Sequence, residues 1–554
     1  MELRRVALGL LLAACASTQP PGATAGALPG AVAAPEAHAA REGASVLRAG
    51  GNAFDAAVCV GFVLAVTHPE AGNLGGGGFL LVHRPGERFA IDAREVAPQA
   101  ATRDMYLDSN GIVRPDLTLV GPLAAGVPGS VAGYLRLHER CGSLPRGRLL
   151  APAIRLAEEG FRVDAGLAAS LERNRHLLAR FEETRRVFFR DQRPLRQGEL
   201  LRQPELAAVL RAIAAEGAEG FYRGRIAEAI AAGSAAHGGG ITTDDLAAYA
   251  PKEREVLSGA FAGHEVVTMP PPSSGGVLLL QILAMLERGG YGTMRPVQRH
   301  HFLAEVSRRA FADRTPHFGD PDFVDVPVAE LLDPAYLQHR LESIDLTRAT
   351  PSSEIEGRPL PAESPETCHF SVVDRAGNAV ACTTTLNGAY GCGLMVHGVL
   401  LNNEMDDFSV KPGIPNQFGL VQGEKNAIEP GKRPLSSMTP AILLREGRPV
   451  LVLGSPGGPT IISTVAQVVA NRLLLGMDLA DAVRAPRLHC QWLPDEILHE
   501  ELPPAELRAL ERLGHRLRRK AGPMGDVQAV GLGESAVSDP RGRGAALPDG
   551  QNSE

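Results

Sequence analysis

The stretch that decides the fold is Thr367-Cys-His-Phe-Ser-Val-Val-Asp-Arg-Ala-Gly-Asn-Ala-Val-Ala-Cys-Thr-Thr-Thr385. Two runs of strand-forming residues flank a central segment, 374–378, whose Asp, Gly and Asn favour a tight turn. A hairpin centred on Ala376 pairs residues that are equally distant from it, so Thr367 lies opposite Thr385. A bulge at Gly377 would shift this register by one residue.

The predicted hairpin has one polar and one apolar face, because side chains alternate along a strand. The polar face carries Thr367, His369, Ser371, Thr383 and Thr385. The apolar face carries Cys368, Phe370, Val372, Val380 and Cys382. The apolar face is therefore expected to pack on the core. The polar face on its own also fits the general preference of threonine for strands.

Thr367 is a candidate nucleophile if the chain is cut directly before it. A threonine needs a base to take its hydroxyl proton, and its own α-amine can do this once it is the first residue of a chain. A free α-amine has a pKa of about 7.7–8.0, close to the working pH that suits a general base. Residues 345–366 are polar and Pro-rich, and they predict an exposed linker in which such a cut is sterically feasible.

Outside the hairpin, the sequence predicts helices and strands in separate regions. Residues 52–66 are apolar nearly all round and predict a buried helix that starts at Gly51-Asn52. The predicted strands 79–83 and 88–92 follow a loop with four successive glycines, Gly75 to Gly78. The remaining expectations are helical structure over 150–235, a helix over 277–287, and strands from 367 to about 454.

The composition is that of an ordinary globular protein. The 554 residues include 56 Lys and Arg against 63 Asp and Glu, so the formal net charge is −7. With 44% hydrophobic and 21% charged residues, the chain is not of the intrinsically disordered class. The acidic balance argues against nucleic-acid binding, and 5% aromatic residues argue against an aromatic platform for sugars or bases.

The N-terminus predicts an export signal with a lipid anchor. Arg4-Arg5 precedes an apolar run, Val6 to Ala14, that is too short to span a membrane. The run ends in Leu12-Ala-Ala-Cys15, which resembles a bacterial lipobox with Cys15 as the lipidated residue. We expect a signal peptide over 1–14, a flexible tether over 15–35, and a periplasmic protein anchored to the outer membrane. The alternative is an ordinary signal peptide and an enzyme that is free in the periplasm or secreted.

No metal site or cofactor is predicted. The six cysteines after Cys15 form no CxxC pair or zinc-finger spacing, so they are interpreted mainly as small buried residues. His300 and His301 are adjacent and therefore point in different directions, which favours a helix-surface pair over two metal ligands.

Seven further motifs occur in a fixed order between about Gly50 and Arg541. They are Gly51 to Val58, Thr67 to Phe79, Asp92 to Pro98, Met269 to Gly276, Leu401 to Phe408, Arg433 to Met438 and Gly454 to Gly458. Together they resemble the γ-glutamyltransferases, also called glutathione hydrolases, of the N-terminal nucleophile superfamily. The resemblance implies an α+β fold, a four-layer αββα sandwich, built as one intertwined domain from a large subunit (36–366) and a small subunit (367–554).

The same resemblance implies a role for each candidate site residue. Cleavage between Glu366 and Thr367 would free the nucleophile, and Thr385 would hydrogen-bond it. Arg94 with Ser436 and Ser437 would hold the donor's α-carboxylate, Asn387, Glu404 and Asp407 its α-ammonium, and the backbone N–H groups of Gly457 and Gly458 the oxyanion. The donor is expected to be glutathione, and the acceptor water, an amino acid or a peptide.

Two departures from the family pattern and two rival functions stay open. Cys368 stands where a second Thr is common, and Phe418, in a loop that resembles the lid of bacterial members, lacks the hydroxyl that a Tyr uses there. One rival is a related acylase acting on glutaryl-cephalosporin or poly-γ-glutamate. The presence of Glu404, Asp407 and Arg94 disfavours a donor that lacks the amino-acid head group. The other is an uncleaved, non-catalytic envelope lipoprotein.

Overall fold

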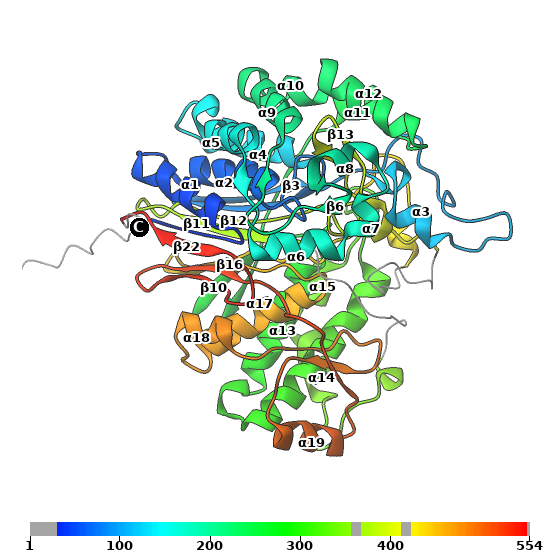
Figure 1. The fold of residues 1–554 in the computed structure, drawn as a ribbon. Coiled ribbons are helices and arrows are strands. Elements are labelled where there is room, and N and C mark those ends of the chain that lie inside the picture. The colour runs from blue at the N-terminus through cyan, green and yellow to red at the C-terminus, as the bar shows by residue number, and fades with distance from the viewer. Residues whose placement is uncertain (1–29, 356–366, 412–422, 551–554) are drawn as a thin grey trace, which may run out of the picture.

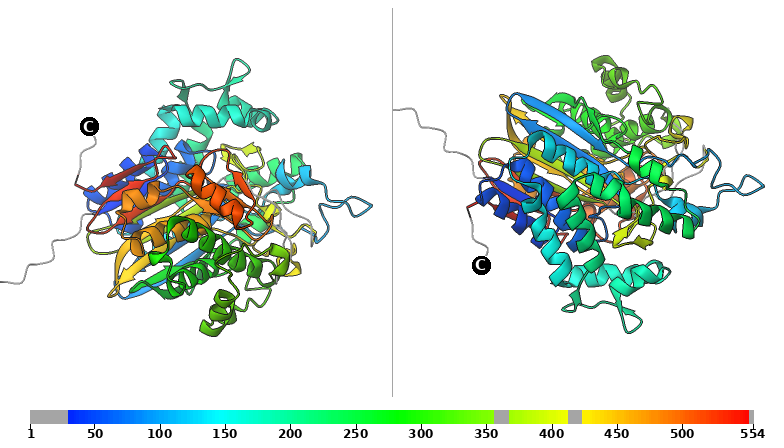
Figure 2. Two further views of the ribbon diagram at one scale, coloured as in Figure 1. Left: turned by 90° about the horizontal axis from the view of Figure 1, so that it is seen from below. Right: turned by 90° about the horizontal axis from the view of Figure 1, so that it is seen from above.

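The computed structural model describes residues 30–355, 367–411 and 423–550. Within these ranges the chain forms two large stacked β-sheets with helices on both outer faces (Figure 1). Views from below and above look onto the two outer layers of helices (Figure 2). This is the predicted αββα arrangement. No helix in the described ranges combines the length and the hydropathy needed to cross a membrane.

The first sheet has seven strands in the order β22-β1-β11-β12-β2-β3-β8. Their bounds are β1 Ala31–Ala34, β2 Gly77–Arg84, β3 Glu87–Ala93, β8 Lys252–Arg254, β11 Cys368–Val373, β12 Ala379–Thr385 and β22 Ala545–Pro548. The hairpin β11–β12 therefore lies between β1 and β2, which come from the other end of the chain. Strands from before and after residue 366 are interleaved, as expected of one intertwined domain.

The second sheet has six strands in the order β21-β20-β16-β15-β10-β9. Their bounds are β9 Leu257–Phe261, β10 His264–Thr268, β15 Ala441–Arg445, β16 Arg448–Gly454, β20 Gln528–Gly531 and β21 Ala536–Ser538. A Cβ atom on Gly454 would overlap the ring of His369 on β11. At this position the glycine leaves room for a side chain of the opposite sheet.

The predicted register of the hairpin is confirmed. Cys368 pairs with Thr384, and the pairing continues without a bulge to Val373 and Ala379. The Oδ1 atom of Asp374 accepts hydrogen bonds from the backbone of Ala376 and Asn378, at 2.9 and 3.0 Å, which closes the turn. Local turn chemistry is therefore enough to fix the pairing of these two strands.

The second sheet covers the polar face of the hairpin, which is buried except at Thr367. His369, Ser371 and Thr383 are each 0% exposed. The Nδ1 atom of His369 lies 2.8 Å from Thr383 Oγ1, and Ser371 Oγ donates to the carbonyl of Gln528 at 3.0 Å. Burial lowers the pKa of His369 to about 3, so its ring is neutral near pH 7. The polar groups are paired with one another, as burial requires.

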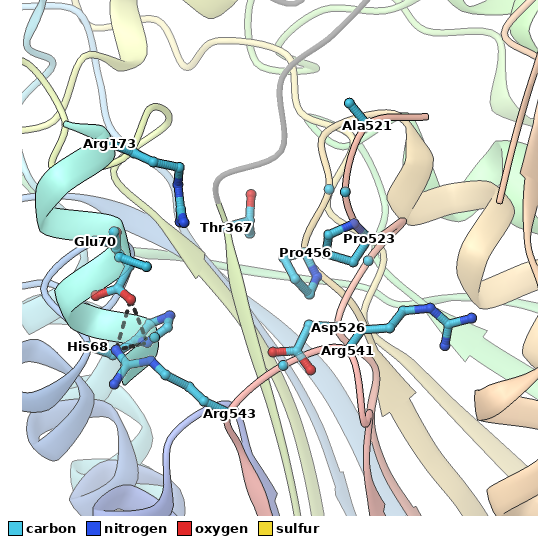
Figure 3. A pocket seen from close by; sticks show the side chains of 17 residues that line it. His68, Glu70, Arg173, Thr367, Pro456, Ala521, Pro523, Asp526, Arg541 and Arg543 are labelled. Carbon is cyan, nitrogen blue, oxygen red and sulfur yellow. Dashed lines mark hydrogen bonds and ion pairs between the residues drawn. The ribbon is translucent and has the colours of Figure 1, made fainter. Parts of the chain in front are cut away.

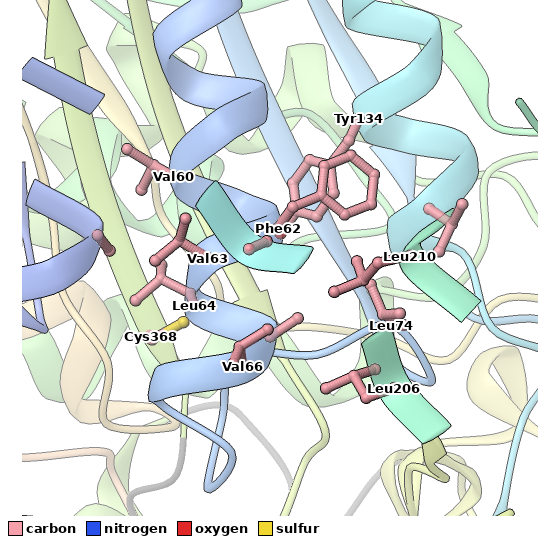
Figure 4. Packing of buried hydrophobic residues seen from close by; sticks show 14 of the residues in the cluster. Val60, Phe62, Val63, Leu64, Val66, Leu74, Tyr134, Leu206, Leu210 and Cys368 are labelled. Carbon is pink, nitrogen blue, oxygen red and sulfur yellow. The ribbon is translucent and has the colours of Figure 1, made fainter. Parts of the chain in front are cut away.

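Helix α2 (Ala53–Thr67) covers the apolar face of the hairpin, and every one of its residues is buried. The side chain of Asn52 accepts a hydrogen bond from the backbone of Asp55, and Asp55 returns one, so the helix starts at the predicted residue with a capping box. Val63 and Leu64 lie close to Cys368, and Phe62 packs against Tyr134 with ring centroids 5.5 Å apart (Figure 4). Each such buried side chain contributes roughly 1.5–3 kcal/mol.

The other helices complete the outer layers. The first sheet is covered by α2 with α1 (Ala37–Arg48) and α4 (Ser130–Cys141), and the second by α13 (Gly275–Arg288), α17 (Thr460–Leu473) and α18 (Leu479–Arg484). Outside α13 lie α14 (Pro296–His317), α15 (Val328–Leu331), α16 (Pro334–Glu342) and α19 (Pro504–Arg512). The predicted helical region holds α5 (Arg146–Glu159), α6 (Ala165–Arg173), α7 (Arg175–Leu178), α8 (Glu182–Phe188), α9 (Pro204–Glu216), α10 (Glu219–Tyr222) and α11 (Gly224–Ala236), with α3 (Pro115–Leu119) and α12 (Thr243–Ala248) nearby in sequence.

Short strand pairs interrupt this region and the C-terminal part. They are β4 (Phe161–Arg162) with β7 (Leu200–Leu201), β5 (Phe189–Arg190) with β6 (Arg193–Pro194), β13 (Met395–Val396) with β14 (Val399–Leu400), and the small sheet of β17 (Leu488–His489), β18 (Ile497–His499) and β19 (Leu517–Arg519). Helical structure over 150–235 is therefore confirmed, with two short pairs of strands inserted into it.

Two sequence interpretations are wrong. His301 is not on a helix surface. It is fully buried, and its Nδ1 lies 2.7 Å from Nε2 of His515, because other helices pack around α14. The segment 345–355 is not an exposed linker throughout, since Ser352 is buried and its carbonyl accepts a hydrogen bond from the indole of Trp492. Residues 356–366 lie outside the described residues.

The cysteines and the buried histidines form no disulfide or clear metal site in the described ranges. Five of the six described cysteines are buried as expected, Cys141 is half-buried, and all six are free. His301, Glu305 and His515 bring ligand atoms within 4.8 Å of one another. The carboxylate of Glu305 already accepts hydrogen bonds from Arg308 and Arg309, and these two positive charges oppose a cation at this place.

Candidate active site

The candidate residues gather at one end of the two sheets. Thr367 precedes β11, Thr385 ends β12, and Arg94 directly follows β3. Because neighbouring antiparallel strands run in opposite directions, the start of one and the end of the next meet at the same edge. In the second sheet β16 ends at Gly454, beside β11, and leads into the Gly457-Gly458 turn at the same end.

The four glycines Gly75 to Gly78 allow backbone segments from distant parts of the sequence to approach closely at this edge. A Cβ atom on Gly76 would overlap the carbonyl of Thr385, and one on Gly75 the carbonyl of Leu400. A Cβ atom on Gly77 would lie 2.5 Å from Oε2 of Glu95. The glycine run is therefore required by close backbone contacts, and it brings Arg94 and Glu95 next to the open end of the hairpin.

Thr367 is partly exposed and lines a cavity of about 700 Å³ together with Pro456 and Gly457 (Figure 3). Gly457 and Gly458 have φ angles of +132° and +55°, which favour glycine, and they precede helix α17. Their carbonyls accept hydrogen bonds from the amides of Thr460 and Ile461, whereas their own N–H groups have no partner among the described residues. Two unpaired amides at a helix N-terminus are suited to stabilising an oxyanion.

Thr385 is one pair beyond Cys368–Thr384 and so faces Thr367 across the open end of the hairpin. Its hydroxyl accepts a hydrogen bond from the amide of Asn387 at 2.8 Å, and its carbonyl accepts one from Asn73 at 2.9 Å. Asn387 has a left-handed φ of +74°, and its side chain donates to the carbonyl of Asn403. The predicted hydrogen bond between Thr385 and Thr367 stays a prediction.

The guanidinium of Arg94 is completely buried and surrounded by carboxylates. Its Nη1 forms an ion pair with Glu404, and its Nη2 lies 2.5 Å from Oδ2 of Asp407. Glu95 Oε2 lies 3.4 Å from Nη1. The family resemblance implied that Arg94 holds the donor's α-carboxylate and that the acidic pair holds the α-ammonium on the same carbon. The structure joins them directly, because a buried cation needs compensating charges.

This cluster carries more acidic than basic groups. Burial raises the pKa of Glu404 well above its usual value and also raises that of Asp407, while the pKa of Glu95 rises to about 7. Burial opposes the charge of Arg94, but the carboxylates around it raise its pKa overall. Glu95 Oε1 and Glu404 Oε2 are buried without a hydrogen-bond partner in the described part of the chain. Such oxygens are natural acceptors for an ammonium group.

Ser436 and Ser437 lie beside this cluster. Arg94 donates to the carbonyl of Leu435 at 3.2 Å, directly before the two serines. Ser437 Oγ accepts a hydrogen bond from Nη2 of Arg314 at 3.2 Å, and Arg314 also donates to Ser274 Oγ at 3.0 Å. The amide of Ser436 donates to the carbonyl of Pro272, which ties the Met269 to Gly276 motif to the site.

Sequence reasoning missed Glu95 and Arg314. Glu95 directly follows Arg94 in the Asp92 to Pro98 motif, so a charge count around the buried arginine could have identified it. Arg314 lies on α14, whose charged residues are mostly buried. The available signal was a helix that contains several arginines but has no distinct polar face, so that some of these arginines must lie inside the protein. Glu366, Phe418 and Cys15 lie outside the described residues.

Comparisons with known proteins agree on one family. A family model described as gamma-glutamyltranspeptidase matches residues 39–549. The glutathione hydrolase proenzyme of Escherichia coli (strain K12) is 45% identical over 569 residues, covering 97% of each chain. The corresponding proenzyme of Pseudomonas aeruginosa is 43% identical and covers 98% of each chain.

Solved structures show the same relationship. The cephalosporin acylase from Bacillus halodurans matches with a TM-score of 0.83 at 28% identity, covering 94% of this chain and 96% of that one. The Helicobacter pylori gamma-glutamyltranspeptidase matches with a TM-score of 0.56 at 39% identity, covering 64% of this chain and 97% of that one.

Proposed function

The chain belongs to the gamma-glutamyltranspeptidase family, and from this premise we propose how its residues perform the family's reaction. It is an autoprocessing γ-glutamyl hydrolase and transferase that cleaves the γ-glutamyl bond of glutathione and related compounds. The observation that carries the residue assignment is the position of Thr367, which shares a cavity with Gly457 at the sheet edge from which Arg94 emerges.

Thr367 is the nucleophile, and it becomes the first residue of the small subunit when the Glu366–Thr367 bond is cut. Its α-amine takes the hydroxyl proton while Oγ bonds to the γ-carbonyl carbon of the donor. The same proton then goes to the leaving nitrogen as the amide bond breaks, which leaves a γ-glutamyl ester on Thr367. Water or an amino acid or peptide acceptor displaces the ester and restores the hydroxyl.

The backbone N–H groups of Gly457 and Gly458 stabilise the negative oxygen of each tetrahedral intermediate. Their unpaired state among the described residues supports this role, because such donors need no rearrangement at the moment of reaction. Thr385 positions Thr367 from the opposite strand. The register of the hairpin supports this assignment.

The cluster around Arg94 recognises the amino-acid end of the donor. Arg94, Ser436 and Ser437 hold the α-carboxylate, and Glu404, Asp407 and Asn387 hold the α-ammonium. Each charge of the donor meets an opposite charge, because the carboxylates beside Arg94 accept hydrogen bonds from the ammonium and the guanidinium of Arg94 donates to the carboxylate. The zwitterion therefore adds no net charge to the buried site.

A related acylase activity is the second candidate, favoured by the fold similarity to the Bacillus halodurans cephalosporin acylase. A glutaryl group has no ammonium, so it would bring a negative charge beside Glu404 and Asp407 without compensation. The acidic excess at Arg94 therefore favours γ-glutamyl donors over glutaryl donors.

The large subunit (36–366) and the small subunit (367–554) form a heterodimer after cleavage, and a lipid on Cys15 holds the enzyme at the outer membrane. The interleaved first sheet supports the heterodimer, and the lipobox supports the anchor.

The substitution Thr367→Ala tests both processing and chemistry. The purified variant should stay one chain on a denaturing gel and release no product from glutathione, since it lacks the attacking oxygen. The wild type should give two chains, the smaller one with Thr367 at its N-terminus by sequencing. A variant that still separates into the same two chains would assign the cut to an external protease.

A further inference from the structure

The cavity beside Thr367 extends away from the Arg94 cluster. Arg94, Glu404 and Asp407 do not line it. Its walls come from the loop after α2, from α6, and from two C-terminal loops at 521–526 and 541–543. Its volume of about 700 Å³ lies within the usual range of ligand pockets, roughly 300–1,000 Å³. The cavity is therefore large enough for a substrate part that the Arg94 cluster does not hold.

We propose that this cavity binds the half of the substrate beyond the scissile bond, which is the leaving peptide or the incoming acceptor, and that Arg173 binds its carboxylate. This inference rests on the proposed function, because it assumes that Thr367 carries the γ-glutamyl group. The ligand class is an amino acid or short peptide with a free amine at one end and a free carboxylate at the other.

Among the described residues that line this cavity, Arg173 is the arginine that is available to a ligand. Arg543 already contacts Asp164 at 2.6 Å and Glu70 at 2.8 Å. Arg541 contacts Glu500 at 2.7 Å and also Asp539. Arg173 has no ion pair or side-chain hydrogen bond within the described residues, and it is exposed at the end of α6. Figure 3 shows its side chain reaching from α6 toward Thr367.

Helix α6 leaves space in front of Arg173. Gly166, Ala169 and Ser170 also line the cavity, one and two turns before Arg173 on the same helix face. Their small side chains keep that face open, so the guanidinium at its end is accessible from the cavity. A carboxylate bound there would lie on the opposite side of Thr367 from the donor's amino-acid end.

Two acidic side chains also line the cavity. Glu70 is only 7% exposed, and its Oε2 has no hydrogen-bond partner among the described residues. Asp526 lies below Thr367 in Figure 3, and its Oδ1 accepts a hydrogen bond from Gln528 at 2.7 Å. Burial raises the pKa of Asp526 to about 7. These carboxyl groups match the amine end of the ligand, as Arg173 matches its carboxylate end.

The test compares two donors with the same γ-glutamyl half. Glutathione has a leaving peptide with a carboxylate, whereas γ-glutamyl-p-nitroanilide has a leaving group without one. Arg173→Gln should lower kcat/KM for glutathione hydrolysis about tenfold, the loss expected for one charge-assisted contact at a partly exposed site. It should change kcat/KM for the anilide less than about twofold. Arg180→Gln is the matched control, since Arg180 is another exposed arginine and does not line the cavity.

Acceptors provide an independent comparison in the transfer reaction. The wild type should use glycylglycine at a lower KM than glycylglycine amide, and Arg173→Gln should remove this difference. Equal losses on both donors, or an unchanged preference for the free carboxylate, would overturn the proposal. A wild-type protein that acts on neither donor would instead refute the proposed function, so the two failures are distinguishable.

Discussion

Replacing Asp407 by Asn separates recognition of the donor's ammonium from every other part of the reaction. The substitution keeps the size of the side chain and removes one negative charge. Arg94 retains Glu404 and Glu95 as partners, so its buried positive charge is still balanced by carboxylates. The substitution should therefore weaken mainly the binding of a ligand that carries a positive charge.

The magnitude follows from the burial of the contact. The Asp407 side chain is 14% exposed and its Oδ2 lies 2.5 Å from Arg94, so an ammonium bound there is largely removed from water. Losing one partner of a buried, hydrogen-bonded charge pair costs about 2–5 kcal/mol. This corresponds to a loss in kcat/KM of roughly 30-fold to several thousand-fold for γ-glutamyl-p-nitroanilide.

The assay measures kcat/KM for γ-glutamyl-p-nitroanilide and glutaryl-p-nitroanilide, which differ only in the α-ammonium. Asp407→Asn should reduce the first value strongly and leave the second unchanged or raised. The thermal midpoint and the two-chain pattern on a gel serve as controls for folding and processing. Equal losses on both substrates with an intact fold would contradict the assignment of Asp407 and favour the acylase alternative.

Three further predictions concern packing, pH and anchoring. Gly454→Ala should lower the free energy of unfolding by about 1–3 kcal/mol in urea titrations, because its methyl group would overlap the His369 ring between the sheets; an unchanged midpoint would contradict this packing. The lowered pKa of His369 means that the unfolded chain binds a proton below about pH 6.5 while the folded chain does not until about pH 3, so stability should fall with falling pH across this window. In His369→Gln the free energy of unfolding should fall less steeply with falling pH than in the wild type, by up to about 1.4 kcal/mol per pH unit across this window. The same pH dependence in both proteins would contradict the lowered pKa of His369. Cys15→Ser should give a protein that is not processed at this site. Intact-mass analysis should find lipid on a large subunit that starts at Cys15 in the wild type, and a lipid-free wild-type subunit that starts later would indicate an ordinary signal peptide.

The features that the sequence predicts well depend on neighbouring residues. The hairpin register follows from the turn at 374–378 and the alternation on both sides of it, and it holds pair by pair. Helix α2 follows from a continuous apolar run with a capping residue at Asn52. In both cases the deciding interactions occur within about twenty residues, so a local sequence pattern is enough to predict them.

The features that the sequence does not predict depend on distant contacts. The polar face of the hairpin is buried because strands from 448–454 and 528–531 pack over it. Arg94 pairs with Glu404 and Asp407 across more than three hundred residues, which no local spacing encodes. His301 is buried because His515 reaches it from a separate segment. The family motifs predict the site residues, but only the fold shows which of them touch.

The interleaved strand order of the first sheet affects whether the cleaved protein can refold after it has unfolded. The hairpin β11–β12 lies between β1 and β2, so neither product of a cut at Glu366–Thr367 holds the whole of this sheet. The two chains would stay together through a shared hydrogen-bond ladder and could separate only by unfolding. Once separated, they would have to find each other in solution, and the entropic advantage of a single chain would be gone. The intact precursor would thus be the form from which the active enzyme assembles, and thermal inactivation of the cut enzyme should be harder to reverse than that of the uncut Thr367→Ala chain.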